Sequence, residues 1–440
     1  MLKDSFCSSP WFHIRINPAG YFIPCRWAPE WLPTDNVSDY NIKNCSIMDF
    51  MTSPFMNQFR LEKLQGIKSS ACEHCYYEDS HDKLSGRHKQ LLKSAITIKD
   101  FNKSICASPH YNLFEDSLTN GKTLNSPTDI QIDLGNTCNS ACIMCTPSYS
   151  SKLATDYKKL IKLSPDVFPV YAPVTNWADN PELLNKFVDE LQSIKNLRYL
   201  HFIGGETLYL RSFYKICNAL IDAGLSKDIM LGITTNLTIY SQELVDLIKH
   251  FKEVHLGVSI EALTELNDYI RYPSKISEVK TVLDCFLELR EHTNLHVSLR
   301  LTPSIFTVYQ ITDIFKLMIE KNVIVESCNI LSTPSCLRME LLPEDLRQRT
   351  IEKIENLINS YQLINTAQII NHRRGDLISG VISNRIFEYL QFLKNYTVPD
   401  DVELERYKLV KFIKSFEAIR NNSILDHLPD YENFLRSYGY

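Results

Sequence analysis

Residues 128–145 read Thr-Asp-Ile-Gln-Ile-Asp-Leu-Gly-Asn-Thr-Cys-Asn-Ser-Ala-Cys-Ile-Met-Cys, and this stretch decides the fold. Residues 128–134 alternate apolar and polar side chains, which predicts a half-buried strand. Three cysteines follow in a loop, and a helical pattern then runs from about 150 to 163. The chain therefore passes from a strand through a cysteine-bearing loop into a helix, as a βα unit does.

The spacing of Cys138, Cys142 and Cys145 is C-x3-C-x2-C. Three thiolates at this spacing can hold three irons of a 4Fe–4S cluster and leave the fourth iron open. A zinc knuckle and three unrelated cysteines are the alternatives. Zinc sites usually close with a fourth Cys or His at short spacing, and none follows nearby. The pattern therefore favours a cluster with one open coordination position.

Strand and helix patterns alternate through the middle of the chain. Residues 196–203 read as a strand that runs into Gly204-Gly205-Glu206. Further apolar strands end near residues 235, 260, 302 and 328, and helical patterns separate most of them. Such alternation predicts parallel βα units with right-handed crossovers. In a βα barrel the working residues lie at the carboxyl ends of strands, where the cysteines and the Gly-Gly-Glu fall.

These motifs resemble those of the radical S-adenosylmethionine (SAM) superfamily. The three cysteines match its defining motif, and Gly204-Gly205-Glu206 matches its Gly-Gly-Glu after the second strand. Met144 stands where an aromatic residue often precedes the third cysteine. The resemblance implies an α/β fold with a partial (β/α)6 TIM-like barrel. It also implies that the open iron chelates SAM, whose reductive cleavage gives a 5′-deoxyadenosyl radical that abstracts hydrogen from a substrate.

The resemblance also suggests which residues contact SAM. The matching positions after the second, third and fourth strands are Gly204, Gly205, Glu206, Thr235, Asn236, Ser259, Glu261 and Arg271. The glycines would let the backbone approach SAM closely, and Glu206 would accept a charge-assisted hydrogen bond from its ammonium group. The polar residues after the third and fourth strands could equally be helix caps or surface ion pairs. No catalytic acid or base stands out.

Four further cysteines, Cys7, Cys25, Cys72 and Cys75, lie in the N-terminal region. Residues 13–17 and 21–24 read as short strands joined by an Asn-Pro-Ala-Gly turn, which would bring Cys25 back toward Cys7. Four thiolates can close a site completely, with either zinc or an iron–sulfur cluster. Spacing alone does not choose between the two.

The pattern of these four cysteines resembles the auxiliary-cluster module of SPASM and twitch radical SAM proteins. Four cysteines rather than seven match the shorter twitch form, which implies a second 4Fe–4S cluster, with zinc as the alternative. The module precedes the barrel here, whereas it follows the barrel in most of that group. The twitch element after the C-x2-C corresponds to residues 78–87, without the usual glycine near residue 82. The second cluster is expected to accept an electron from a substrate radical.

The composition fits a folded enzyme. With 440 residues and 44% hydrophobic content, the chain is long enough for several domains. We predict an auxiliary module at 1–110, a radical SAM barrel at 125–342 and a helical C-terminal region at 343–440. The net charge of −5 gives no general attraction to nucleic acid. No signal peptide and no apolar run of about 20 residues is visible, so a cytoplasmic location and no membrane partner are expected.

Three functions are compatible with this reading. The first is a radical SAM oxidoreductase acting on a peptide or peptide-derived substrate, with an electron donor such as flavodoxin or ferredoxin. The second is the same chemistry on a small molecule such as an aminosugar or nucleoside. The third is a non-catalytic iron–sulfur or zinc protein, which the complete cysteine motif and the Gly-Gly-Glu argue against. The remaining cysteines, at positions 45, 106, 217, 285, 328 and 336, read as ordinary residues.

Overall fold

The structure is a computed structural model, and it forms two compact units. It describes residues 5–29, 40–80, 85–93, 117–328, 331, 333–364 and 374–440. The first unit comprises Met1–Asn136, Val174–Ile233 and Asp246–Val254, and the second comprises Thr137–Pro173, Thr234–Val245 and His255–Tyr440. Cys106 and residue 82 lie outside the described residues.

One sheet has the strand order β2-β1-β3-β4-β5-β6-β7-β8. Its strands are β1 (His13–Ile16), β2 (Phe22–Ile23), β3 (Asp129–Asp133), β4 (Tyr199–Ile203), β5 (Met230–Thr235), β6 (Glu253–Ser259), β7 (Leu295–Leu301) and β8 (Ile324–Cys328). The pairs β1–β3, β3–β4, β4–β5 and β7–β8 are parallel, whereas β1 and β2 are antiparallel. The strands from β3 to β8 follow one another in both sequence and space, as expected of βα repeats.

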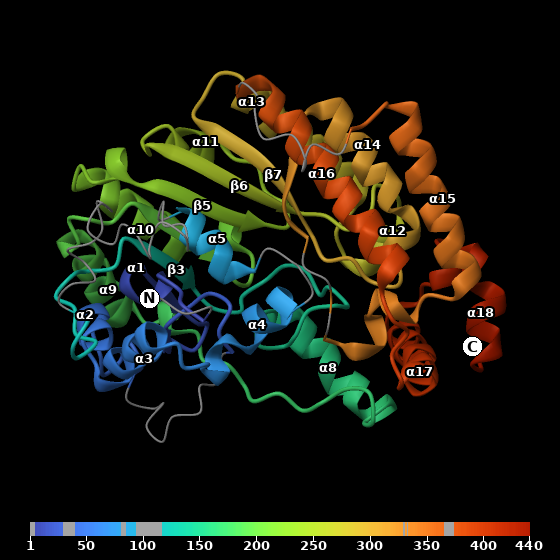
Figure 1. Ribbon diagram of the computed structural model, residues 1–440, viewed down its shortest axis with the longest axis horizontal. Helices are drawn as coiled ribbons and strands as arrows, with labels where there is room; N and C mark the ends of the chain where they lie inside the picture. The colour runs from blue at the N-terminus through green and yellow to red at the C-terminus, as the bar shows by residue number, and fades with distance from the viewer. Residues whose placement is uncertain are drawn as a thin grey trace. The chain divides into compact units, whose positions relative to one another are not determined.

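Helices connect these strands (Figure 1). They are α8 (Ser151–Leu163) and α9 (Pro181–Ser193), α10 (Arg211–Asp222), α11 (Gln242–Ile248), α12 (Leu266–Ile270) and α13 (Ile276–Arg290), and α14 (Ile311–Lys321). The alternation confirms the predicted α/β fold class, a partial (β/α)6 barrel with additional elements at both ends. The predicted strands at 128–134 and 196–203 and the predicted helix at 150–163 agree with the observed elements to within a few residues.

Local sequence explains where the first two of these helices begin. The Ser150 hydroxyl accepts a hydrogen bond from the backbone N–H of Leu153 at 3.0 Å, which caps α8. The Asn180 side chain caps α9 in the same way, and Pro181 occupies the first helical position, where its missing N–H costs nothing. The apolar side of α9 is buried along its length, so packing stabilises the helix after its cap has fixed the first turn.

The N-terminal hairpin belongs to the same sheet as the barrel strands. Gly20 closes the predicted turn, because its N–H donates to the carbonyl of Asn17 at 2.9 Å with a φ of +89° that favours glycine. The hairpin strand β1 then pairs in parallel register with β3. This pairing was not predicted, because the sequence pattern assigned the hairpin only to the auxiliary module. The cysteines of the module are therefore anchored to a strand that adjoins the barrel strands.

Helices on both sides of the hairpin in the sequence make up the rest of the module. They are α1 (Ser9–Phe12) before the hairpin, then α2 (Ile47–Met51), α3 (Pro54–Gln65), the 3-10 turn η2 (Ser70–Cys72), α4 (Glu73–Ser80) and α5 (Gly86–Lys93). In α3, the Ser53 side chain caps the first turn and Gly66 ends the helix in the left-handed conformation.

The strands of the first unit are buried on both faces, but the faces differ in character. Apolar residues such as Ile130 and Ile132 alternate with polar residues on the opposite face. On the polar face, Arg15 forms an ion pair with Asp133 at 2.7 Å, although both side chains are almost completely buried. Burial raises the pKa of Asp133, and the Arg15 guanidinium opposes that effect.

Four helices make up most of the C-terminal region, as predicted. They are α15 (Glu344–Ser360), α16 (Arg374–Asn395), α17 (Val402–Arg420) and α18 (Glu432–Ser437). Helices α15 and α16 pack against each other and against α14 (Figure 1). Among the described residues, none of the helices has the length and apolar character that a bilayer crossing requires. The boundaries of the three predicted domains remain a prediction.

Candidate metal centres

The three-cysteine loop lies between β3 and α8, and its backbone is held by the segment after α12. Ala141 donates its N–H to the carbonyl of Tyr272 at 2.6 Å, and Ile143 donates to that of Ile270 at 2.9 Å. The thiols of the loop lie close enough to interact. Burial raises the pKa of Cys145 to about 12, and Cys142 and Cys138 add to that rise. The loop therefore gathers three thiols at one place, as a shared metal centre needs.

Asn236, a predicted SAM contact, is tied to this loop. Its amide donates to the Asn139 side chain at 2.7 Å and to the Ser140 hydroxyl at 2.9 Å. Its side-chain oxygen accepts from the backbone and hydroxyl of Thr238 at 3.2 and 2.7 Å. Asn139 in turn donates to the Thr238 hydroxyl at 2.8 Å. Asn236 therefore connects the end of β5 to the two residues that follow Cys138.

Replacing Asn236 with alanine should loosen the cysteine loop. The change leaves the partly buried polar groups of Asn139 and Ser140 without their partner, at a cost of about 1–3 kcal/mol. We expect a lower free energy of unfolding in urea and less iron retained after anaerobic reconstitution. Thr238→Ser, which keeps the hydroxyl that contacts Asn236 and Asn139, is the control. An Asn236→Ala chain with unchanged stability and iron content would contradict this role.

Arg271 connects a second predicted SAM contact to the cysteines. Its guanidinium forms an ion pair with Glu261 at 2.9 Å and reaches the sulfur of Cys142 at 3.6 Å. Glu261 is 2% exposed, and its second oxygen accepts from the backbone N–H of Thr302 at 3.0 Å. Burial raises the pKa of Cys142, while the Arg271 charge opposes the rise. The arginine thus places a positive charge beside a thiol that must lose its proton to bind iron.

The Arg271 guanidinium has one hydrogen-bond donor that the described residues do not use. Its buried Nε has no hydrogen-bond partner among the described residues. Buried donors are nearly always paired in native proteins, so an unpaired one beside the cysteines fits an anionic group supplied by a ligand. The carboxylate of SAM is such a group. The donor set at this place, three thiols with an adjacent arginine, therefore fits an iron–sulfur cluster that binds SAM.

The buried Arg271–Glu261 pair should be strongly coupled. Arg271→Met leaves the Glu261 carboxylate buried without a counter-ion, which should destabilise the chain by about 3–5 kcal/mol. The double variant Arg271→Met with Glu261→Gln removes that charge and should recover much of the lost stability. Urea unfolding of the wild type, both single variants and the double variant measures the coupling. Additive effects of the two substitutions would show that the pair does not act as a unit.

Thr235 and Ser259 lie at the ends of their strands, as predicted. Thr235 is buried, and its hydroxyl accepts a hydrogen bond from the N–H of Leu237 at 3.0 Å. Leu237 has a φ of +59°, so this bond supports an unusual turn after β5. Ser259 is partly exposed at the last position of β6. Their contacts with SAM remain a prediction.

The Gly-Gly-Glu motif forms a tight turn at the end of β4 in the first unit. Gly204 and Gly205 have φ values of +81° and +56°, which glycine adopts at little cost. A Cβ at Gly204 would lie 3.0 Å from that of Asp133 on the neighbouring strand, so close approach also requires glycine. Glu206 is 1% exposed, and its carboxylate accepts from the N–H of Leu208 at 3.2 Å. The motif therefore presents a buried carboxylate, and its contact with SAM stays a prediction.

Several residues near the three cysteines were not predicted. Arg420, at the end of α17, donates to the carbonyl of Ala141 at 2.6 Å and pairs with Asp156 at 2.8 Å. Burial raises the pKa of Tyr157, and Tyr171, Cys336 and Cys145 add to the rise. Arg420 lies in the sequence Glu417-Ala418-Ile419-Arg420, which by itself does not mark a residue beside the cysteines. The positions of Tyr157 and Tyr171 in the sequence do not mark them either.

Four thiols converge in the first unit. Burial raises the pKa of Cys7, and the proximity of Cys25, Cys72 and Cys75 raises it further. Burial likewise raises the pKa of Cys75 to about 12, with Cys25 and Cys72 as further causes. These mutual effects require the four thiols to be neighbours. The structure thus brings together the four cysteines that the sequence grouped.

Backbone N–H groups surround these sulfurs. Ser9 donates to the sulfur of Cys7 at 3.4 Å, and Trp27 donates to that of Cys25 at 3.5 Å. A backbone hydrogen bond from Arg87 lowers the pKa of Cys75, against the larger effect of burial. Hydrogen bonds to ligand sulfurs are one of the means by which proteins tune iron–sulfur clusters. Four neighbouring thiols, of which those of Cys7 and Cys75 are buried, fit a closed metal or cluster site with such donors.

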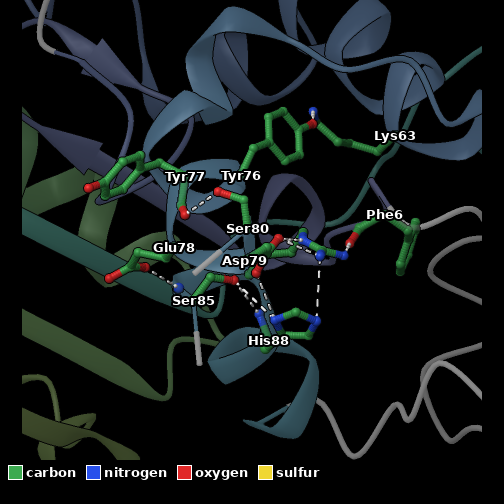
Figure 2. A network of polar contacts seen from close by, with 11 residues as sticks. Phe6, Lys63, Tyr76, Tyr77, Glu78, Asp79, Ser80, Ser85 and His88 are labelled. Carbon is green, nitrogen blue, oxygen red and sulfur yellow. Dashed lines mark hydrogen bonds and ion pairs between the residues drawn. The ribbon is translucent and has the colours of Figure 1, made fainter. Parts of the chain in front are cut away.

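A polar network joins the chain segments that carry Cys7 and Cys75 (Figure 2). The Arg87 side chain donates to the Asp79 carboxylate at 2.5 Å and to the carbonyl of Phe6, which precedes Cys7, at 3.4 Å. The His88 ring lies 2.9 Å from the other oxygen of Asp79. Arg87 therefore links the start of the chain, helix α4 and helix α5, the three elements around Cys7 and Cys75.

A polar cavity of about 620 Å³ lies elsewhere in the second unit. Its lining includes Tyr309, Lys353 and His427, and none of the predicted site residues contributes to it. The cavity is therefore separate from the residues that the cysteine chemistry implicates.

Comparison with known proteins agrees with this chemistry. Residues 132–302 match the family model described as the radical SAM superfamily, and residues 7–76 match SPASM, described as an iron–sulfur cluster-binding domain. No curated protein sequence matches the chain.

The solved structures that match the chain have low sequence identity to it. Streptococcus suis SuiB bound to the precursor peptide SuiA is 14% identical with a TM-score of 0.37, over 73% of this chain and 66% of SuiB. Native anSMEcpe with bound AdoMet is 16% identical with a TM-score of 0.36, over 53% of this chain and 60% of that one. The match thus spans about two thirds of the length of SuiB and 60% of the length of anSMEcpe.

The matched models also define the cofactors. Radical SAM proteins use a 4Fe–4S cluster together with SAM, and the SPASM domain binds further iron–sulfur clusters. The three-cysteine motif and the Gly-Gly-Glu lie within the first matched segment, and the four N-terminal cysteines lie within the second. Residues 132–302 of the chain are thus similar to the radical SAM superfamily, and residues 7–76 are similar to the SPASM iron–sulfur cluster-binding domain.

Proposed function

We propose that the protein is an oxidoreductase that removes hydrogen from a peptide or peptide-derived substrate. The bound cluster and SAM together supply a 5′-deoxyadenosyl radical, which takes the hydrogen atom. The observation that carries the proposal is the presence of two cysteine sets in one chain, one with three thiols and one with four. Three thiolates would leave one iron of the first cluster free to bind SAM. Four thiolates would coordinate every iron of the second cluster.

The protein's own residues have distinct tasks in this proposal. Cys138, Cys142 and Cys145 ligate the first cluster, and Asn236 holds their loop in place. Arg271 offers its unpaired Nε to the carboxylate of SAM. Glu206 and the turn formed by Gly204 and Gly205 receive the ammonium end of SAM. The further polar residues proposed to contact SAM are Thr235, Ser259 and Glu261. Glu261 also holds Arg271 in position through their ion pair.

The second cysteine set is proposed to bind a 4Fe–4S cluster that takes one electron from the substrate radical. Cys7, Cys25, Cys72 and Cys75 occupy all of its coordination positions, which suits electron transfer rather than substrate binding. The substrate then loses a proton to a base, so a hydrogen atom, an electron and a proton account for a two-electron oxidation. A flavodoxin or ferredoxin is the proposed electron donor and acceptor.

The peptide substrate class rests on the SPASM-type module, because enzymes that the chain resembles through this module commonly modify peptides. This is an argument by analogy. A small molecule such as an aminosugar or nucleoside is the alternative, and the same experiment separates the two.

The test screens every short peptide that the neighbouring genes encode, each prepared with deuterium at its carbon positions. The anaerobically reconstituted protein is incubated with SAM, reductant and each peptide. We expect deuterium in the 5′-deoxyadenosine, and the unlabelled peptide should give a product about two mass units lighter than the substrate, as the loss of two hydrogens requires. A peptide of scrambled sequence is the control. Deuterium-free 5′-deoxyadenosine with every neighbouring peptide would contradict the peptide assignment and favour a small molecule.

A further inference from the structure

A pair of histidines lies on the strands β6 and β7, outside both cysteine sets. His255 is in the first half of β6, and His296 is the second residue of β7. Their ring centres are 5.0 Å apart, and the two rings are tilted by 35°. The two strands are neighbours in the sheet (Figure 1). The pair therefore lies near the start of its strands, whereas the three-cysteine loop follows the end of β3.

Glu253 adds a carboxylate to the two imidazoles. It lies two residues before His255 on the same strand, and alternate residues of a strand point to the same face. One ligand atom from each of Glu253, His255 and His296 lies within 4.8 Å of the other two. Two imidazole nitrogens and a carboxylate oxygen form a ligand set that suits a divalent transition metal ion. The set contains no thiol, so it differs in chemistry from the two cysteine sets.

The three side chains are accessible to an ion from solvent. His296 is exposed, and Glu253 and His255 are partly exposed. The ligand atoms around a tetrahedral zinc ion lie about 3.3 Å from one another. Small rotations of these accessible side chains bring the three atoms to that spacing without disturbing a packed core.

The charged residues farther along β7 and β8 form a pair of their own. Arg300 lies 2.9 Å from the Glu326 carboxylate, and the Ser298 hydroxyl donates to the same oxygen at 3.1 Å. The arginine charge is thereby compensated by a carboxylate outside the three-residue set. It therefore does little to repel a metal ion held by the histidines.

We propose that Glu253, His255 and His296 bind one divalent transition metal ion, for which zinc is the probe. Three protein ligands leave one position of a tetrahedral ion open, and water fills it. This site is separate from the cysteine sets and does not depend on the proposed function.

The test is equilibrium dialysis of zinc against the reconstituted full-length protein, whose cysteine sets already hold iron. Zinc and iron are counted in the same samples, and we expect about one zinc ion per chain with no loss of iron. In His296→Ala, the zinc affinity should fall about 100-fold or more, because even the loss of a group that only hydrogen-bonds a ligand costs about 10–100-fold. Glu253→Gln keeps the shape of the side chain without its charge and should also bind zinc more weakly.

X-ray absorption at the zinc edge identifies the ligands directly. Nitrogen and oxygen ligands lie about 2.0–2.1 Å from zinc, whereas cysteine sulfur lies about 2.3 Å away. We expect only the shorter distances in the wild-type protein. Sulfur neighbours would place the ion in a cysteine set and overturn the proposal.

His292→Ala is the matched control. His292 is exposed, precedes β7 and does not belong to the three-residue set. Its replacement also removes one imidazole, and we expect wild-type zinc affinity. An equal loss of affinity in His292→Ala and His296→Ala would show that zinc binds surface imidazoles without specificity, which overturns the proposal.

Two further outcomes are decisive. Wild-type zinc affinity in His296→Ala would overturn the proposal, and so would zinc uptake that occurs only as iron is lost. The iron content of each variant shows whether its chain is intact. If His296→Ala does not retain iron, Glu253→Gln carries the test, and wild-type affinity in that variant is the contradicting result.

Discussion

Replacing Cys142 with alanine is expected to abolish SAM cleavage. A cluster held by two of three thiolates is not retained, so the iron content should fall from roughly eight to roughly four per chain. Without the open iron, SAM has no chelating site, and 5′-deoxyadenosine should not exceed the amount formed without protein. Anaerobic reconstitution, iron and sulfide counts and chromatography of the products with a strong reductant measure both effects.

Cys217→Ala is the control for this experiment. Cys217 is fully buried in α10, and burial alone raises the pKa of its thiol, so it behaves as a small apolar residue. Its replacement should leave iron content and SAM cleavage close to the wild type. Substantial 5′-deoxyadenosine formation by Cys142→Ala, with wild-type iron content, would show that Cys142 is not a ligand.

Replacing Cys72 with alanine is expected to separate the two cysteine sets. The variant should lose roughly four irons and the signal of the second cluster. It should still form 5′-deoxyadenosine with excess reductant, because the first cluster and its SAM contacts do not involve Cys72. With a substrate present, the oxidised product should disappear, since the substrate radical has lost its electron acceptor.

The opposite results would assign the N-terminal cysteines differently. Normal product formation by Cys72→Ala would rule out the electron-acceptor role. Loss of one zinc per chain with an unchanged iron count would identify a structural zinc site.

Much of the fold could be predicted because its signals are local. The alternation in residues 128–134 and the helical pattern in residues 150–163 depend only on neighbouring residues, and they predicted β3 and α8 to within a few residues. The parallel pairing of β1 with β3 joins segments more than a hundred residues apart. No local pattern encodes such a pairing, so the sequence could not show that the N-terminal hairpin extends the barrel sheet.

The candidate sites were predictable to the extent that cysteine spacing encodes them. The residues that support the cysteines were not, because their types are common and their contacts are distant in sequence. Lys63 in a helix with many polar residues reads as a solvated side chain, yet it is fully buried, with its ammonium nitrogen 3.4 Å from the Tyr76 hydroxyl. Asn236 was predicted as a SAM contact, and the structure shows in addition that it holds the cysteine loop.

The most direct test of the central claim is whether the wild-type protein cleaves SAM. The protein is reconstituted anaerobically with iron and sulfide, mixed with SAM and a strong reductant, and assayed for 5′-deoxyadenosine and methionine in equal amounts. The account predicts both products, with none in the Cys142→Ala protein. Absence of 5′-deoxyadenosine from fully metallated wild-type protein, while a known radical SAM enzyme forms it under identical handling, would contradict the account.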